Sequence, residues 1–106
     1  MEVHPLDPPF RLVDTLILAS LSREPRHGYR LEAHVVNISG GRIMPGRSTV
    51  YKALGRLVRE GLVIELVSAP GDRRRYYDIT GDGRSQLGRD LRLLRGVVQA
   101  FDLRMT

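Results

Sequence analysis

The chain has 106 residues, of which 42% are hydrophobic and 27% charged, a balance typical of one soluble globular domain. It contains no cysteine, which excludes a disulfide framework and a thiolate metal site and favours a cytoplasmic location. Seventeen basic and twelve acidic residues give a net charge of +5, which suits a polyanionic partner such as nucleic acid. Every basic residue except Lys52 is arginine, a bias that phosphate binding and a GC-rich coding sequence explain equally well.

The chain begins with a segment that does not resemble a helix. Residues 1–9 contain three prolines and two acidic residues, and they predict an N-terminal arm rather than a secretion signal. The apolar run from Phe10 to Leu21 then predicts a first, buried helix, which Pro25 stops. The longest uncharged apolar stretch, residues 15–22, is too short to cross a bilayer, so no membrane partner is expected.

Two more helices are predicted before the chain turns to strands. Gly28 begins the second helix, and the glycines at positions 40–41 end it. We expect His27 to help cap this helix. The third helix follows the break at Pro45-Gly46 and ends at Gly61. Each helix has an apolar stripe, which consists of Leu31, Val35 and Ile38 in the second and of Val50, Leu54, Leu57 and Val58 in the third.

A β-hairpin and a long helix complete the chain. Residues 62–67 and 75–79 are rich in β-branched and aromatic side chains, and a turn at 70–72 lies between them. Thr80 is placed to cap a last helix that runs to the C-terminus. Three helices followed by a hairpin are the order of a winged helix-turn-helix. The predicted class is α+β, mostly α, with an arm at 1–9, a DNA-binding domain at 10–80 and a C-terminal dimerisation helix at 81–106.

One face of the third helix is polar and lacks acidic residues. Lys52 and Arg59 lie on it opposite the apolar stripe, and no carboxylate occurs before Glu60. A helix that enters the major groove of DNA needs such a face, with short polar groups at its start and cations farther along. The alternative is an ordinary solvated face and, for Tyr51, a ring half-buried against the hairpin. The predicted DNA contacts on this helix are Arg47, Ser48, Thr49, Tyr51, Lys52 and Arg56.

The hairpin carries three consecutive arginines. Arg73, Arg74 and Arg75 lie at its tip and return strand, where alternation sends their side chains to different sides. In a wing they would contact phosphates or enter the minor groove, and we predict that they bind DNA. The alternative is that they keep an exposed hairpin soluble and protect its edge from pairing.

The last helix has the most regular apolar pattern in the sequence. Its spacing of four, three, four, three and four predicts a seam between two helices. A second apolar strip includes Val97, so one face can pack on its own domain while the other needs a partner, which an identical chain would supply. The alternatives are a helix that folds back completely on its own domain and one that lies on a membrane. The predicted dimer residues are Leu87, Leu91, Leu94, Val98, Phe101 and Met105.

The sequence shows no recognisable catalytic or metal site. His4, His27 and His34 have no second histidine or carboxylate at a metal-binding spacing on one helix face. There is no glycine-rich phosphate loop, nucleophile elbow or closely spaced acid pair. We therefore expect neither an enzyme nor a bound metal or cofactor.

Several short motifs stand in a specific order along residues 12–94. They are His27-Gly28-Tyr29, Pro45-Gly46 with Ser48-Thr49-Val50-Tyr51-Lys52-Ala53-Leu54, Arg56-Leu57 with Glu60-Gly61-Leu62-Val63, and Arg74-Arg75-Tyr76-Tyr77-Asp78-Ile79-Thr80 with Gly83-Arg84. This arrangement resembles the PadR family of transcriptional regulators. The resemblance implies a winged-helix domain that binds double-stranded DNA, a homodimer formed through the C-terminal helix, and repression of nearby genes that a small-molecule effector often relieves.

The chain departs from the family pattern in two places. Arg47 and Ser48 stand between Pro45-Gly46 and Thr49, where the family often has Pro-Gly-Thr-Leu-Tyr, and this leaves the start of the third helix open. The chain also has no tryptophan, which argues against a drug pocket between tryptophans at the dimer interface. The predicted function is a sequence-specific regulator, acting as a repressor, that binds a palindromic operator as a homodimer. The alternative is a winged-helix adaptor that binds an acidic protein through the same basic face.

Overall fold

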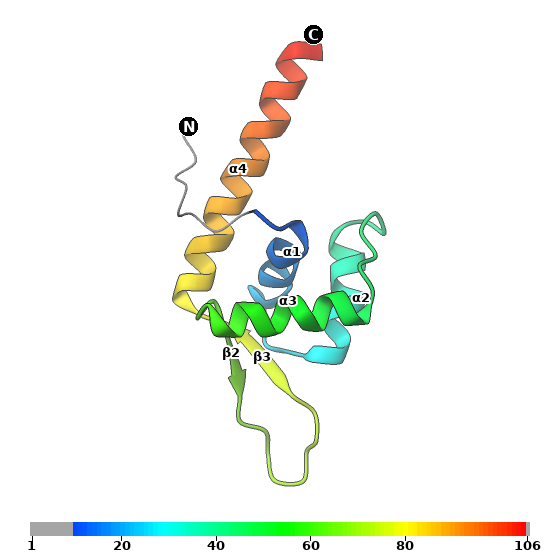
Figure 1. Ribbon diagram of the computed structural model, residues 1–106, viewed down its shortest axis with the longest axis vertical. Coiled ribbons are helices and arrows are strands. Elements are labelled where there is room, and N and C mark those ends of the chain that lie inside the picture. Colours follow the sequence, from blue (N-terminus) through cyan, green and yellow to red (C-terminus); the bar gives the residue numbers. More distant parts are fainter. Residues whose placement is uncertain (1–9, 106) are drawn as a thin grey trace.

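The computed structural model describes residues 10–105, and its elements follow the order of a winged helix-turn-helix (Figure 1). The predicted α+β, mostly α class is confirmed. The arm predicted at residues 1–9 lies outside the described residues, and the division into three segments stays a prediction. The elements are α1 (Leu12–Leu21), β1 (Arg26–His27), α2 (Gly28–Ile38), α3 (Arg47–Arg59), β2 (Val63–Leu66), β3 (Tyr76–Ile79) and α4 (Gly81–Met105).

Helix α1 is the centre of the hydrophobic core and contacts α2, α3, α4 and β3. Ile17, Leu18 and Leu21 are completely buried, as the apolar character of the helix on most sides predicted. Burying a side chain of this size contributes about 1.5–3 kcal/mol, so the other elements assemble on α1. Ile38 departs from the predicted stripe of α2, because it is 45% exposed. The rest of the core consists of Leu31, Val35, Val50, Ala53, Leu54, Leu57, Val63, Tyr77, Ile79 and Leu87.

The wing belongs to a three-stranded antiparallel sheet in the order β1-β3-β2 rather than to a hairpin alone. Strands β2 and β3 pair with Val63 opposite Ile79 and Leu66 opposite Tyr76. The additional strand β1 has two residues and places His27 opposite Tyr76. Two residues are too few to show an alternating pattern, which is why the sequence did not predict this strand. Through β1 the base of the wing is joined to the start of α2.

The start of α2 lies close to both the wing and α3. The Gly28 N–H donates a hydrogen bond to the carbonyl oxygen of Arg75 at 3.0 Å. A β-carbon at Gly28 would lie 3.1 Å from the Tyr77 ring and 3.2 Å from the Tyr51 ring, closer than such atoms usually pack. Glycine therefore allows α2, α3 and β3 to meet at one point, and this meeting fixes the wing relative to α3.

The predicted helix caps have different outcomes. The cap of α4 is confirmed, because the Gly83 N–H donates a hydrogen bond to Thr80 Oγ1 at 3.0 Å. The prediction for α2 is wrong, because His27 occupies the N-cap position but its side chain makes no capping hydrogen bond. The His27 ring instead packs edge-on against Tyr29 and Tyr76, with ring centroids 5.1 and 4.1 Å away. The pairing of β1 with β3 brings these rings together.

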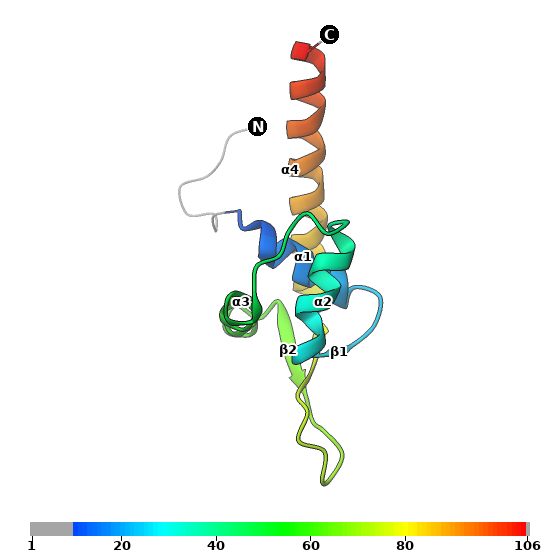
Figure 2. The ribbon, with the colours of Figure 1, turned by 90° about the vertical axis from the view of Figure 1, so that its right-hand side faces the viewer.

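Helix α4 packs on the domain with its first part only. Gly83, Leu87 and Asp90 are buried, and no described residue of α4 after Asp90 is buried. The helix continues past the domain, so its free end and the tip of the wing lie at opposite ends of the molecule (Figures 1 and 2). The alternative in which the whole helix folds back on its own domain is therefore wrong.

Candidate nucleic-acid interface

Helix α3 has one buried apolar face and one exposed polar face. Val50, Ala53, Leu54 and Leu57 are at most 3% exposed, which confirms the apolar stripe and adds Ala53 to it. Val58, which the pattern also included, is only partly buried. All the predicted contacts on this helix except Arg56 are classed among the exposed residues: Arg47, Ser48, Thr49, Tyr51 and Lys52.

Helix α3 begins at Arg47, so the start of the third helix, which the sequence left open, is now defined. Gly46 precedes it with φ of 84°, a left-handed conformation that favours glycine. The first turn contains no acidic residue, so the partial positive charge of the helix N-terminus and the Arg47 cation both favour an anionic partner. Arg47 Nε lies 3.9 Å from Glu32 Oε2, a weak contact between exposed side chains that leaves Arg47 able to turn toward a ligand.

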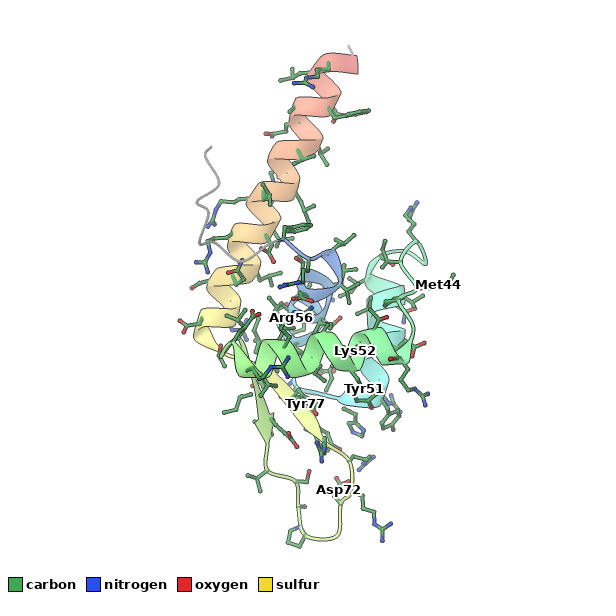
Figure 3. The ribbon with its side chains drawn as sticks, in the orientation of Figure 1. Met44, Tyr51, Lys52, Arg56, Asp72 and Tyr77 are labelled. Atoms are coloured by element: carbon green, nitrogen blue, oxygen red, sulfur yellow. The ribbon has the colours of Figure 1, made fainter. Side chains whose placement is uncertain are left out.

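Arg56 does not extend into solvent as the sequence pattern predicted. Its Nη2 and Nε donate hydrogen bonds to the Asp14 carboxylate of α1 at 2.5 and 3.4 Å. The two side chains are 28% and 11% exposed, so the pair lies mostly between the helices (Figure 3). The reason lies in the tertiary structure, because the partner Asp14 comes from the neighbouring helix α1. The spacing of residues within α3 cannot reveal such a partner. In this arrangement Arg56 joins α3 to α1.

The surroundings of Tyr51 agree in part with both predictions for it, a DNA contact and a ring half-buried against the hairpin. The residue is 42% exposed, and its ring packs beside Gly28 at the start of α2. It lines an open hollow with Tyr29, Tyr77 and the three wing arginines. The ring is thus half-buried near the base of the wing, while the side chain also borders a surface rich in cations. Such a hydroxyl group can donate a hydrogen bond to a phosphate oxygen.

The wing arginines are exposed but have different neighbours. Arg74 Nε donates a hydrogen bond to Asp72 Oδ1 at 3.0 Å, and this bond lowers the pKa of Asp72. Arg75 Nε lies 3.6 Å from Glu65 Oε1, with both side chains largely exposed. Among the described residues, Arg73 has no carboxylate partner within salt-bridge distance. Because exposed ion pairs contribute only about 0–1 kcal/mol, all three cations are available to a phosphate backbone.

The basic surface also includes the first turn of α2, which the sequence pattern did not predict. Tyr29 and Arg30 are exposed there beside the wing. Hydrogen bonds from Arg30 and Arg74 lower the pKa of the Tyr29 hydroxyl group. Burial and the charges of Arg74 and Arg30 lower the pKa of His27, which favours its neutral ring. The signal that could have revealed these residues is the basic residue directly after the Gly28-Tyr29 helix start.

The predicted dimer residues on α4 divide into two groups. Leu87 is only 9% exposed and belongs to the core of its own domain, so it is not free for a second chain. Leu91, Val98 and Phe101 are 44%, 56% and 61% exposed. Leu94 is partly exposed, and the side chain of Met105 lies outside the described part of the structure. The remaining seam thus forms an apolar face on the part of α4 that has left the domain, together with Val97 and Ala100 of the second strip.

Across residues 10–105 no helix combines the length and apolar character needed to cross a bilayer. In the same range no three histidine, cysteine or acidic side chains gather as metal ligands would.

The sequence and the fold are both similar to those of other proteins. Over 75 residues the chain is 37% identical to an uncharacterized 37.1 kDa protein in transposon TN4556 of Streptomyces fradiae, a match that covers 71% of this chain and 21% of that protein. The chain thus spans about a fifth of the length of that curated relative. A PadR family transcription regulator from Clostridium difficile has a TM-score of 0.76 at 22% identity, over 91% of this chain and 100% of that chain.

A second solved structure contains nucleic acid. Bacillus subtilis PadR in complex with operator DNA has a TM-score of 0.67 at 23% identity, over 76% of this chain and 47% of that chain. At these identities the two structures establish the winged-helix fold. The model of the transcriptional regulator PadR-like family matches residues 17–89, which include α2, α3, the wing and the packed part of α4. The chain therefore belongs to the PadR-like family, whose members are transcriptional regulators rather than enzymes.

Proposed function

We propose that the chain is a sequence-specific regulator that binds double-stranded operator DNA with α3 in the major groove and the wing on the flanking backbone. The observation that carries this proposal is the exposed face of α3, which has hydroxyl groups and cations and no carboxylate among its first three turns. The joining of α2, α3 and the wing at Gly28 supports it, because the two basic surfaces then form one unit. The operator complex of the structurally similar Bacillus subtilis PadR agrees with this use of the fold.

The exposed residues of this surface have distinct proposed tasks. Ser48, Thr49 and Lys52 reach base edges from the first turns of α3, where short polar groups and one cation suit the major groove. The phosphate contacts come from Arg47, Tyr51, Arg73, Arg74 and Arg75. Arg56 has a supporting task, because its guanidinium group is already occupied by Asp14.

We also propose that two copies of the chain associate through the apolar face of α4. Leu91, Val98 and Phe101 leave an apolar surface that the chain itself does not cover, and a two-fold axis would bring the same surface of a second copy against it. Two α3 helices would then meet half-sites about 34–36 Å apart on an imperfect palindrome. Binding at such a site would block transcription of the adjacent gene. A small-molecule effector would act on the dimer, in a pocket not built from tryptophan.

The test is selection of genomic DNA fragments by the purified protein, followed by affinity measurements over a salt series. We expect a palindrome bound by a dimer, with log affinity falling by about 0.9 per contacted phosphate for each tenfold rise in salt. Lys52→Ala should weaken binding by about tenfold or more, whereas Arg92→Ala, a control on the exposed part of α4, should not change it. Weak, equal binding to all fragments would contradict the proposal and favour the protein-binding adaptor.

A further inference from the structure

Asp90 marks the point at which α4 leaves the domain. It is 8% exposed, and every described residue that follows it on α4 is partly or fully exposed. Its Oδ2 accepts a hydrogen bond from Thr15 Oγ1 of α1 at 2.7 Å, and its Oδ1 accepts one from Gln86 Nε2 at 2.8 Å. Thr15 is 2% exposed, so this contact between α1 and α4 is buried.

A buried carboxylate stabilises the contact between two helices less efficiently than apolar packing does. Transferring the charge from water to the protein interior costs several kcal/mol. An apolar pair of similar volume would stabilise the contact between the helices equally well or better. Leu87, one turn earlier on the same side of α4, already provides apolar packing in the core. The hydrogen bond also restrains the orientation of α4 relative to α1, because a short bond to a charged acceptor tolerates little change in distance or angle.

The residue next to Thr15 makes a corresponding contact with a different helix. Asp14 holds Arg56 of α3, while Thr15 holds Asp90 of α4. Two consecutive residues of α1 therefore connect α3 to α4 at the point where α4 leaves the domain. Both polar contacts are therefore made by the same helix, one with α3 and one at the point where α4 leaves the domain.

We propose that the Thr15–Asp90 hydrogen bond sets the spacing of DNA half-sites that the dimer accepts. From Asp90 to Met105 the helix rises about 22 Å, so a tilt of about 10° at Asp90 displaces its far end by about 4 Å relative to the domain. One base pair advances about 3.4 Å along DNA, so a displacement of about 4 Å between the domain and the far end of α4 is comparable with a one-base-pair change in half-site spacing. This inference rests on the proposed function, because it requires a dimer formed through α4 and operator binding by α3.

The experiment compares the selected palindrome with versions whose half-sites are one base pair closer or farther apart. Thr15→Val keeps the size of the side chain and removes the hydroxyl donor. Thr15→Ser is a separate variant that keeps the hydroxyl donor. For the wild type we expect about tenfold weaker binding after each one-base-pair change. Thr15→Val should reduce that difference to about threefold or less, and Thr15→Ser should retain it. Ser20→Ala is the matched control, because it removes a buried hydroxyl group whose hydrogen bond, to the Leu16 carbonyl oxygen, stays within α1.

Circular dichroism and sedimentation measurements establish that each variant is folded and dimeric. If Thr15→Val does not fold, Asp90→Ala provides the same test, because it removes the acceptor of the Thr15 hydrogen bond. A folded, dimeric Thr15→Val with the spacing preference of the wild type would overturn the inference, as would a wild type that accepts all three spacings equally. A wild type that neither dimerises nor selects an operator would instead contradict the proposed function.

Discussion

The variant Arg56→Met distinguishes two possible functions of Arg56. One is to join α3 to α1 through Asp14, as the structure shows, and the other is to contact DNA, as the sequence position indicates. Arg56→Met keeps the apolar stem and leaves the Asp14 carboxylate without its partner. A fully buried pair loses about 3–5 kcal/mol when one partner is removed, and an exposed pair about 0–1 kcal/mol. Because Arg56 is 28% and Asp14 11% exposed, we expect a loss of about 2 kcal/mol in the free energy of unfolding.

Urea unfolding without DNA measures this loss. All variants are compared at one protein concentration, because the stability of a dimer depends on concentration. For a domain of this size, about 2 kcal/mol corresponds to a decrease in Tm of roughly 10 °C. Asp14→Asn should destabilise less, since the remaining Arg56 cation can turn to solvent. The double variant should lose less than the sum of the two single variants, by about 1 kcal/mol, because the two groups contact each other.

The opposite result would refute this reasoning. If Arg56→Met unfolds at the same urea concentration as the wild type but binds the operator tenfold more weakly, Arg56 acts on DNA and not on α1. A salt dependence shallower by about 1.8, one phosphate contact in each subunit, would identify that action as phosphate binding.

Three further predictions concern other parts of the molecule. Arg73→Ala should make the salt dependence of operator binding shallower by about 1.8 for a dimer, while Arg92→Ala leaves it unchanged; an unchanged slope for both would show that the wing tip does not touch phosphate. Thr80→Ala should cost about 1 kcal/mol in urea unfolding through loss of the α4 cap, and a cost near zero would assign the cap no energetic role. Burial and the charge of Arg26 lower the pKa of His34 below 6.5, so the folded state favours the neutral ring; the resulting stability is present above pH 6.5 and is lost as the pH falls through the lowered pKa. His34→Gln should therefore reduce the decline of the urea midpoint from pH 7.5 to 5.5, and an unchanged decline would assign it to other groups.

Periodicity within single elements predicted most of the fold. The stripes of α2 and α3 and the seam of α4 identified helices with nearly correct bounds, because apolar residues on one face need a core wherever they occur. The first helix begins at Leu12 rather than Phe10, and the strands are shorter than their β-branched runs. Strand β1 has no such signal, because it exists only through its pairing with β3.

The candidate site was predictable where exposure follows from the helix face alone. Ser48, Thr49 and Lys52 are exposed as expected. Arg56 and Leu87 differ because their surroundings come from α1, which is distant in sequence: Asp14 neutralises the first, and the core covers the second. A single sequence contains no information about which carboxylate meets which cation across two helices.

The division of α3 into two faces has a consequence for redesign. The side chains that would read DNA are exposed, and exchanges at exposed positions usually change stability by less than about 0.5 kcal/mol. Ser48, Thr49 and Lys52 lie within about one turn of one another, so the effects of exchanging them couple and have to be measured together. A library that varies Ser48, Thr49 and Lys52 together could therefore be selected for a different DNA sequence, while the scaffold keeps its shape.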